Sequence, residues 1–292
     1  MTALSDNIAM TVHARVAAAR QRLRDAGLSP SEADLCARAL AEHALGWTAE
    51  RLLTDGGDAE PAGFASRFDA LIARRAAREP LPYIVGYREF WNLDFEVTPA
   101  VLIPRPETEL IVEAALDIVP PGAGATIADL CTGCGCVAIA VARERPSARV
   151  IATDISDSAL VVARRNADRH GVADRIHFEH ADLLSGIDDH FDVIVANPPY
   201  VAACVRPALQ PEVRDHEPNL ALFGGDDGLG MLERLVRDAP ARIRAGGSLV
   251  FEFGFGQDEE IERMIAQSGE LTLVELKRDL QGIARTAIAR RR

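Results

Sequence analysis

Residues 125–136 read Ala-Thr-Ile-Ala-Asp-Leu-Cys-Thr-Gly-Cys-Gly-Cys, an apolar run that passes into a turn of small residues. The run at 125–130 predicts a buried strand, and the apolar stretch at 137–145 predicts a helix. A tight turn of small residues between a parallel strand and a helix lets a ligand approach the backbone at the carboxyl edge of the sheet. We therefore expect a ligand site at residues 131–136.

Strand-like and helix-like segments alternate along the rest of this part of the chain. The strand-like segments are residues 125–130, 149–154, 176–179, 191–196 and 248–253. The helix-like segments are residues 137–145, 158–170 and 229–243. This alternation predicts βαβ units with right-handed crossovers and a parallel sheet. Two further short strands, 271–274 and 286–289, are expected to form an antiparallel edge pair.

Residues 1–80 are expected to be entirely helical. Apolar residues spaced three and four apart predict helices over 5–26, from Pro30 to about Gly46, and over 61–78. Ser29 is the expected N-cap of the second helix. From Pro80 onward, five prolines in a segment rich in aromatic and β-branched residues predict short extended pieces, such as a hairpin. The predicted domains are a helical domain at 1–80, a β-hairpin or extended linker at 81–104, and an α/β domain at 105–292.

The composition excludes several classes of protein. The 292 residues carry 32 Lys and Arg against 44 Asp and Glu, a net charge of −12 that disfavours non-specific nucleic-acid binding. The longest apolar runs are far shorter than the ~18–20 residues of a membrane span. Residues 1–10 contain Asp6 and no basic residue, which does not fit a signal peptide. We expect a cytoplasmic monomer that binds neither membranes nor nucleic acid directly.

The cysteines are odd in number and three of them lie within six residues. They are Cys36, Cys131, Cys134, Cys136 and Cys204. Cytosolic thiols stay reduced, so a disulfide framework is not expected. Structural zinc requires four ligands, and no second Cys-x-x-Cys or His pair completes a set. We expect no metal.

Acidic residues follow the second and third strands of the α/β domain. Asp154 is placed to bind the two ribose hydroxyls of a nucleoside, and Asp182 to bind an adenine amino group. Ile155 and Leu183, which follow these acids, are assigned to the same site. An acid after a strand is often only a helix cap, but the two acids and the turn, in order at consecutive strand ends, favour an adenosine-type ligand.

The sequence of the turn distinguishes between two candidate cofactors. Dinucleotide folds prefer Gly-x-Gly-x-x-Gly, with the pyrophosphate at a helix N-terminus. Here the pattern is Asp-x-Cys-x-Gly-x-Gly, and Asp129 is a poor neighbour for phosphate but a suitable one for a cationic, methionine-like group. S-adenosylmethionine therefore fits better than NAD. The expected cofactor-binding residues are Asp129, Cys131, Thr132, Gly133, Cys134, Gly135, Asp154, Ile155, Asp182, Leu183 and Asn197.

The fourth strand ends in Asn197-Pro198-Pro199-Tyr200. An amide nitrogen is a poor nucleophile because its lone pair is delocalised. The Asn197 side-chain oxygen and the Pro198 carbonyl can each accept one of its N–H groups and hold it in place. Tyr200 can stack on a planar acceptor and exclude water. All four residues are candidates for catalysis and for substrate binding, although the tetrapeptide alone could also be a simple proline turn.

Asn-Pro-Pro-Tyr after the fourth strand resembles the amino-methylating class I methyltransferases, and further segments narrow the resemblance to the release-factor glutamine N5-methyltransferases, the HemK/PrmC family. These segments cover the chain in order. They are residues 78–86 (Arg-Glu-Pro-Leu-Pro-Tyr-Ile-Val-Gly), 89–91, 101–109 (Val-Leu-Ile-Pro-Arg-Pro-Glu-Thr-Glu), 217–225 (Glu-Pro-Asn-Leu-Ala-Leu-Phe-Gly-Gly), 227–229 and 278–280.

The resemblance implies a helical N-terminal domain that recognises the substrate, a β-hairpin linker and a seven-stranded, Rossmann-like methyltransferase domain. It implies methyl transfer from S-adenosylmethionine, which becomes S-adenosylhomocysteine, to the glutamine amide in the Gly-Gly-Gln motif of class 1 peptide release factors. Within its motif, Arg105 and Glu107 are implied to bind substrate. The chain departs from the family at Cys131, usually Gly, at Cys134, often Ser or Thr, and at Pro82, often Gln.

Other functions remain as alternatives. A relative could methylate a ribosomal-protein glutamine or an exocyclic amine of nucleic acid, and the acidic charge disfavours the second acceptor. A nicotinamide oxidoreductase is disfavoured by the pattern of the turn. A non-catalytic adaptor is disfavoured by the intact Asn-Pro-Pro-Tyr.

Overall fold

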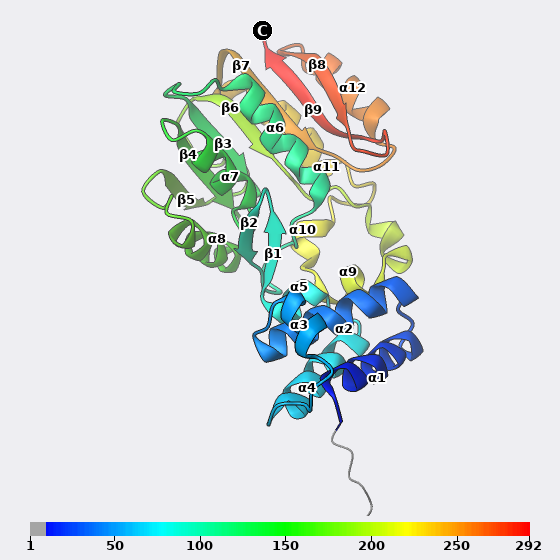
Figure 1. Ribbon diagram of the computed structural model, residues 1–292. Helices are drawn as coiled ribbons and strands as arrows, with labels where there is room; N and C mark the ends of the chain where they lie inside the picture. The colour runs from blue at the N-terminus through cyan, green and yellow to red at the C-terminus, as the bar shows by residue number, and fades with distance from the viewer. Residues whose placement is uncertain (1–9) are drawn as a thin grey trace, which may run out of the picture. The chain divides into compact units, whose positions relative to one another are not determined.

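The computed structural model describes residues 10–292, which form two compact units that divide between Gly86 and Tyr87 (Figure 1). The division lies six residues after the predicted end of the helical domain. The expectations for residues 1–9, namely the start of the first helix and the lack of a signal peptide, lie outside the described residues. No helix in the described part of the chain is both long enough and apolar enough to cross a membrane.

The N-terminal unit is helical, as predicted. Thr11, Ser29 and Thr48 cap three of its helices by accepting a backbone N–H with the side-chain hydroxyl. The faces predicted to be apolar meet in a core that includes Leu23 and Phe68, both fully buried. The helices are α1 (Val12–Asp25), α2 (Pro30–Leu45), α3 (Ala49–Asp55), α4 (Phe64–Ala76) and α5 (Leu81–Val85).

Helix α5 corrects the prediction for the start of the linker. Residues 81–85 are helical rather than extended, because a proline in the first helical turn needs no N–H partner there. The predicted hairpin follows it, with β1 (Tyr87–Phe90) antiparallel to β2 (Leu93–Glu96). Trp91 and Asn92 form its two-residue turn with φ of 53° and 54°, the conformation that matches the twist of a tight hairpin.

Seven strands form the sheet of the second unit, in the order β5-β4-β3-β6-β7-β9-β8 (Figure 1). The first five are parallel, and β9 pairs antiparallel with both β7 and β8, so the predicted antiparallel pair at the edge is confirmed. The strands are β3 (Thr126–Leu130), β4 (Arg149–Asp154), β5 (Ile176–His180), β6 (Phe191–Ala196), β7 (Ile243–Glu252), β8 (Leu271–Arg278) and β9 (Ala284–Arg291).

Helices cover both faces of this sheet (Figure 1). The strand order reverses direction beside β3, so right-handed crossovers place α7 and α8 on one face and α11 on the other. Helix α6 packs beside α7, and α12 packs beside α11. The α-helices are α6 (Glu109–Ile118), α7 (Cys136–Glu144), α8 (Asp157–Arg169), α9 (Pro211–His216), α10 (Asn219–Leu222), α11 (Gly230–Asp238) and α12 (Asp258–Ser268).

Short 3₁₀ turns occur at three places, η1 (Pro106–Thr108), η2 (Ala203–Ala208) and η3 (Ala239–Arg242). The helix predicted over 229–243 therefore ends early. Pro240 lies in η3, where an α-helix would have lost a hydrogen bond, and β7 begins at Ile243 instead of residue 248.

Asn166 on α8 connects the hairpin to the turn after β3. Its side-chain oxygen accepts from the Glu96 backbone N–H at 2.7 Å, and its amide nitrogen donates to the Glu96 carbonyl at 3.0 Å and the Cys134 carbonyl at 2.9 Å. The side chain is fully buried, so these contacts satisfy an amide that would otherwise be costly to bury. The hairpin is thus fixed to the same helix that supports the turn.

Candidate active site

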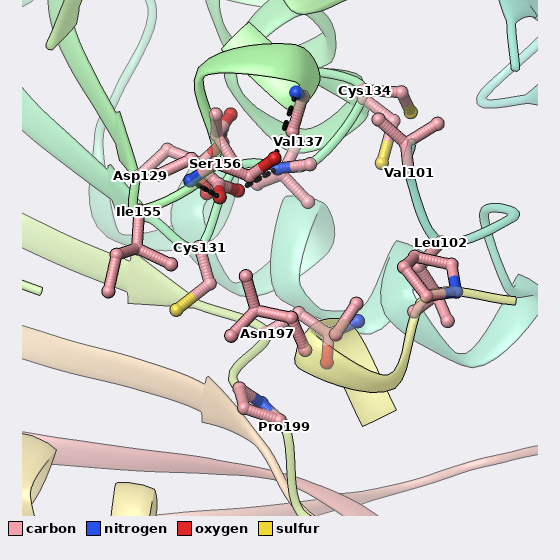
Figure 2. A pocket seen from close by; sticks show the side chains of 18 of the residues that line it. Val101, Leu102, Asp129, Cys131, Cys134, Val137, Ile155, Ser156, Asn197 and Pro199 are labelled. Atoms are coloured by element: carbon pink, nitrogen blue, oxygen red, sulfur yellow. Dashed lines mark hydrogen bonds between the residues drawn. The ribbon is translucent and has the colours of Figure 1, made fainter. Parts of the chain in front are cut away.

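A cavity of about 200 Å³ opens at the carboxyl ends of β3, β4 and β6, far above the ~10–15 Å³ that one water molecule needs. This edge is where ligands bind in open α/β sheets. Figure 2 shows Asp129, Ile155 and Ser156 on one side of the cavity, and Asn197 and Pro199 on another. Its wall also includes Val101, Leu102, Arg105, Thr108, Cys131, Thr132, Gly133, Cys134, Cys136, Val137, Asp154, Asp182, Leu183, Pro218, Leu220, Ala221, Met231 and Arg234.

The turn after β3 has the left-handed backbone that its glycines suggest. Gly133 and Gly135 have φ of 57° and 84°, and Cys131 has φ of 58°, which is unusual for a residue with a side chain. Gly135, predicted to bind cofactor, does not line the cavity among the described residues. A Cβ there would lie 3.0 Å from Ile139 Cδ1 and 3.2 Å from Ala163 Cβ, so this glycine lets α7 and α8 pack closely.

Asp129 lies at the end of β3 with 2 % of its surface exposed. Its Oδ2 accepts from the Thr132 hydroxyl at 2.6 Å and from the Ala138 backbone N–H at 3.1 Å. Burial raises the pKa of this carboxyl to about 7. A cation in the cavity would favour its ionised form, which agrees with the expected methionine-like ligand.

Asp154 ends β4 and is hydrogen-bonded to two neighbouring loops. Oδ2 accepts from the Gly133 N–H and Oδ1 from the Ser156 N–H, each at 2.9 Å. Burial raises the pKa of this carboxyl, against the opposing effect of these hydrogen bonds. Each carboxylate oxygen can accept more than one hydrogen bond, so both remain able to accept from a ribose hydroxyl. Ile155, which follows, is 47 % exposed and lines the cavity.

Asp182 follows β5 and forms an ion pair that the sequence did not predict. Its Oδ2 lies 2.9 Å from Nη2 of Arg234 on α11, and both residues line the cavity. Leu183 beside it is buried and has φ of 53°. Arg234 was missed because a single arginine on an amphipathic helix carries no local signal of a ligand site.

The Asn-Pro-Pro-Tyr segment begins directly after β6. Asn197 and Pro199 line the cavity, whereas Pro198 and Tyr200 do not, among the residues described. Asn197 Nδ2 donates to the Thr108 hydroxyl at 3.0 Å. The Tyr200 hydroxyl donates at 2.7 Å to Glu252, so this ring has a polar anchor in addition to the expected stacking face.

Thr108 and Glu252 are two further polar residues at this site that sequence reasoning missed. The Thr108 hydroxyl donates to Oε2 of Glu252 at 2.7 Å, and both residues are at most 2 % exposed. Burial raises the pKa of the Glu252 carboxyl, and burial beside that carboxyl raises the pKa of Tyr200. Thr108 lies within the 101–109 segment that carries the family resemblance, whereas Glu252 lies near the end of a predicted strand, where no local pattern indicates a functional residue.

Arg105 and Glu107 were implied to bind substrate. Arg105 lines the cavity, and its Nη2 lies 2.5 Å from Oε1 of Glu217. Glu217 also accepts from the Ile103 backbone N–H at 3.4 Å. Glu107 is half-buried and is not among the described residues that line the cavity. The ion pair fixes the start of the segment containing α10, whose residues 218, 220 and 221 cover one side of the cavity.

The clustered cysteines form part of this wall. Cys131, Cys134 and Cys136 line the cavity, and burial raises the pKa of the Cys131 thiol. The Cys136 thiol also has a raised pKa, first because of its contact with Cys134. Across residues 10–292, no group of three or more His, Cys, Asp or Glu side chains is arranged to hold a metal ion.

Comparison with known proteins adds family evidence to this geometry. Residues 108–209 match the family model "Methyltransferase small domain", and residues 16–86 match "PrmC N-terminal domain". Proteins named "Release factor glutamine methyltransferase" are similar to the chain: one from Cereibacter sphaeroides is 43 % identical, with 94 % of this chain and 96 % of that protein covered. One from Geobacter sulfurreducens is 46 % identical, with 68 % and 69 % covered.

A solved structure supports the fold independently. The methyltransferase from Pyrococcus furiosus has a TM-score of 0.52 against this chain at 18 % identity, with 77 % of this chain and 98 % of that chain covered. At this identity the likeness concerns the fold alone, and it agrees with the expected Rossmann-like, seven-stranded domain.

Proposed function

The chain belongs to the family of release factor glutamine methyltransferases, and we propose that it methylates the glutamine side-chain amide in the Gly-Gly-Gln motif of class 1 peptide release factors. The methyl donor is S-adenosylmethionine. The observation that carries the proposal is the place of Asn197, in the wall of the cofactor cavity with its amide nitrogen already bound to Thr108. Its oxygen is then the atom that can accept from an incoming amide.

The residues present fit the cofactor. Asp154 supplies carboxylate oxygens for the ribose hydroxyls, and Asp182 supplies them for the adenine amino group, while Ile155 and Leu183 give apolar surface for the base. Asp129 and the turn at 131–134 would hold the methionine end. Gly135 supports this turn by packing rather than by contact with cofactor.

The chain's contribution to the chemistry is positioning. When bound, S-adenosylmethionine would supply a methyl group to the amide nitrogen, with S-adenosylhomocysteine as the second product and one proton released from the nitrogen. The Asn197 oxygen and the Pro198 carbonyl would each accept an N–H of the glutamine amide and stabilise the positive charge that develops on nitrogen. Pro199 stiffens the loop, and Tyr200 would stack beside the amide.

The helical domain, predicted at residues 1–80, would recognise the release factor. Arg105 and Glu107, in the second unit, would bind substrate. The linker would be the hairpin β1–β2. The protein would act in the cytoplasm as a monomer, without binding nucleic acid directly. The alternative acceptors, a ribosomal-protein glutamine or a nucleic-acid amine, are not favoured by the relatives' names.

The direct test is transfer of labelled methyl to a purified class 1 release factor. We expect incorporation of one methyl per factor, and none when the glutamine of its Gly-Gly-Gln motif is replaced by alanine. A nucleic acid and a ribosomal protein serve as competing acceptors in parallel reactions. Equal incorporation into either competitor, or into the glutamine-free factor, would contradict the proposed acceptor.

A further inference from the structure

Four side chains from three separate segments form a continuous hydrogen-bond chain beside the cavity. Asn197 Nδ2 donates to Thr108 Oγ1 at 3.0 Å, and Thr108 donates to Glu252 Oε2 at 2.7 Å. From the other side, the Tyr200 hydroxyl donates to Glu252 Oε1 at 2.7 Å. Glu252, at the end of β7, is therefore hydrogen-bonded directly to Tyr200, at one end of the Asn-Pro-Pro-Tyr segment. It is linked to Asn197, at the other end, through Thr108.

The direction of every bond in this chain follows from proton counting. Burial raises the pKa of the Glu252 carboxyl, whereas the hydrogen bonds from Thr108 and Tyr200 lower it and favour the ionised form. In that form the carboxylate can only accept hydrogen bonds, so the Thr108 and Tyr200 hydroxyls each point their single proton at Glu252. Thr108 is then left with lone pairs on the side facing Asn197. The Asn197 amide can meet them only with its NH₂ group. Its oxygen must consequently be the end that is free to accept from a ligand in the cavity.

Burial strengthens the preference for this orientation of the Asn197 amide. Glu252 is 1 % exposed and Thr108 is 2 % exposed, so water does not compete for their hydrogen bonds. Burying a carboxylate is unfavourable in itself. Two hydroxyl donors aimed at one residue require an acceptor on both of its oxygens, and a glutamine at 252 would offer only one.

We propose that Glu252 is a positioning residue for methyl transfer, which sets the orientation of the Asn197 amide through Thr108 and the position of the Tyr200 ring directly. The inference rests on the proposed function, because it assigns to Asn197 the role of accepting from the substrate amide. Glu252 does not line the cavity among the described residues, so it acts only through its two partners. Thr108 links Glu252 and Asn197. Because its hydroxyl donates to the ionised Glu252, it presents only lone pairs to the Asn197 amide.

Glu252→Gln tests the proposal with little change in shape. Its NH₂ group must face one of the two hydroxyls. If it donates to Thr108, the Thr108 proton turns toward Asn197 and favours the flipped amide; if it donates to Tyr200 instead, the buried Tyr200 hydroxyl loses the acceptor for its own proton and the ring loses the contact that positions it. We expect kcat to fall by ~10-fold or more, with the KM for release factor and the Kd for S-adenosylmethionine within about twofold, because the loss is of a preorganised contact.

Substitutions at Thr108 separate the relay from general packing. Thr108→Val removes the hydroxyl at nearly constant volume and should lower kcat as Glu252→Gln does. Thr108→Ser keeps the hydroxyl and should retain most of the kcat of the unmodified enzyme. The matched control is Thr286→Val. Thr286 is fully buried on β9 opposite Glu252, and its hydroxyl has no hydrogen-bond partner among the described residues. This variant should leave kcat unchanged.

Each result has a definite meaning. Near-normal kcat in Thr108→Val or in Glu252→Gln would overturn the positioning role. An equal fall in kcat in the control Thr286→Val would also overturn this role, because the effect would then be structural. The same holds if S-adenosylmethionine binding weakens by as much as kcat falls. Failure of the unmodified enzyme to methylate release factor would instead refute the proposed function. The two inferences therefore fail separately.

Discussion

The guanidinium of Arg105 lies 2.5 Å from the carboxylate of Glu217, although 112 residues separate them in sequence. The Glu217 side chain is 1 % exposed, while that of Arg105 is 32 % exposed and borders the cavity. This ion pair joins the extended stretch before η1 to the segment that carries α10. One wall of the cavity therefore depends on a contact between a buried acid and a partly exposed base.

Arg105→Ala should leave the buried Glu217 carboxylate without its charged partner. We expect the free energy of unfolding to fall by ~1–3 kcal/mol, the usual cost of an unsatisfied buried polar group. The double variant Arg105→Ala/Glu217→Gln removes the charge as well and should recover part of that loss. Thermal unfolding of the three proteins checks this. A double variant less stable than Arg105→Ala would contradict the argument.

Asp154→Ala should weaken binding of S-adenosylmethionine at least ~tenfold, because two charge-assisted hydrogen bonds to the ribose, each worth ~1.5–3 kcal/mol, are lost. Isothermal titration measures the change. Asp157→Ala, at the exposed acid that begins α8 three residues further along the chain, is the control and should bind normally. Unchanged isotherms for Asp154→Ala would remove this residue from the cofactor site.

Asp129 should make cofactor binding depend on pH. Its pKa is about 7 in the fold, so at pH 6 most of the carboxyl is protonated. A cationic ligand favours the ionised form, and binding below pH 7 must then release a proton. We expect the Kd of S-adenosylmethionine to rise about fivefold between pH 7 and pH 6. Asp129→Asn should abolish this slope; a slope that persists in the variant would assign it to another group.

Asn197→Ala should lower kcat by ~10²-fold or more with little change in the KM for release factor. The reason is that its oxygen matters most as the glutamine nitrogen gains positive charge. Steady-state kinetics and the Kd for S-adenosylmethionine, measured on the same preparation, separate this effect from damage to the cavity. A near-normal kcat would reduce the Asn-Pro-Pro-Tyr segment to a structural turn.

Cys131 should tolerate glycine but not valine. Its φ of 58° costs a residue with a side chain ~1–2 kcal/mol, which glycine avoids at an entropic cost of ~0.5–1 kcal/mol. Cys131→Gly should therefore match or slightly exceed the stability of the parent, and Cys131→Val should lose ~1–3 kcal/mol. Cys136→Val, at the first residue of α7, is the control for replacing a thiol by the two methyl groups of valine where φ is not positive. Equal losses in both valine variants would show that the backbone strain is unimportant.

The sequence predicted the sheet closely because buried parallel strands are continuous apolar runs. The bounds of β4 and β6 agree with the prediction to the residue. Helices α6, α9, α10 and α12 were not predicted. Helices α9 and α10 are short and each begins at or directly after a proline, whereas α6 and α12 do carry apolar residues at helical spacing, such as Ile111 with Ala115 and Ile261 with Ile265. Short helices such as α5 depend on tertiary contacts more than on propensity.

At the site, the sequence predicted those functional residues that can be located from their position at the end of a strand. Asp129, Asp154 and Asn197 each lie at or directly after the carboxyl end of a strand, and parallel strands bring these ends together. It failed for Thr108, Glu252 and Arg234, because their partners are distant in sequence and each contact forms only in three dimensions. For Gly135 the prediction erred in the opposite direction. This glycine was assigned to cofactor binding because it lies in the turn, whereas in the structure it allows two helices to pack closely.

The contacts of Asn166 have a consequence for evolution. It holds the hairpin and the cofactor turn only through the main chain of Glu96 and Cys134, so the side chains at 96 and 134 can change without disturbing those bonds. The constraint falls instead on position 166, where no other side chain offers the same donor and acceptor at the same reach. Related sequences should therefore vary at positions 96 and 134 while keeping asparagine at 166, which an alignment of the family would check.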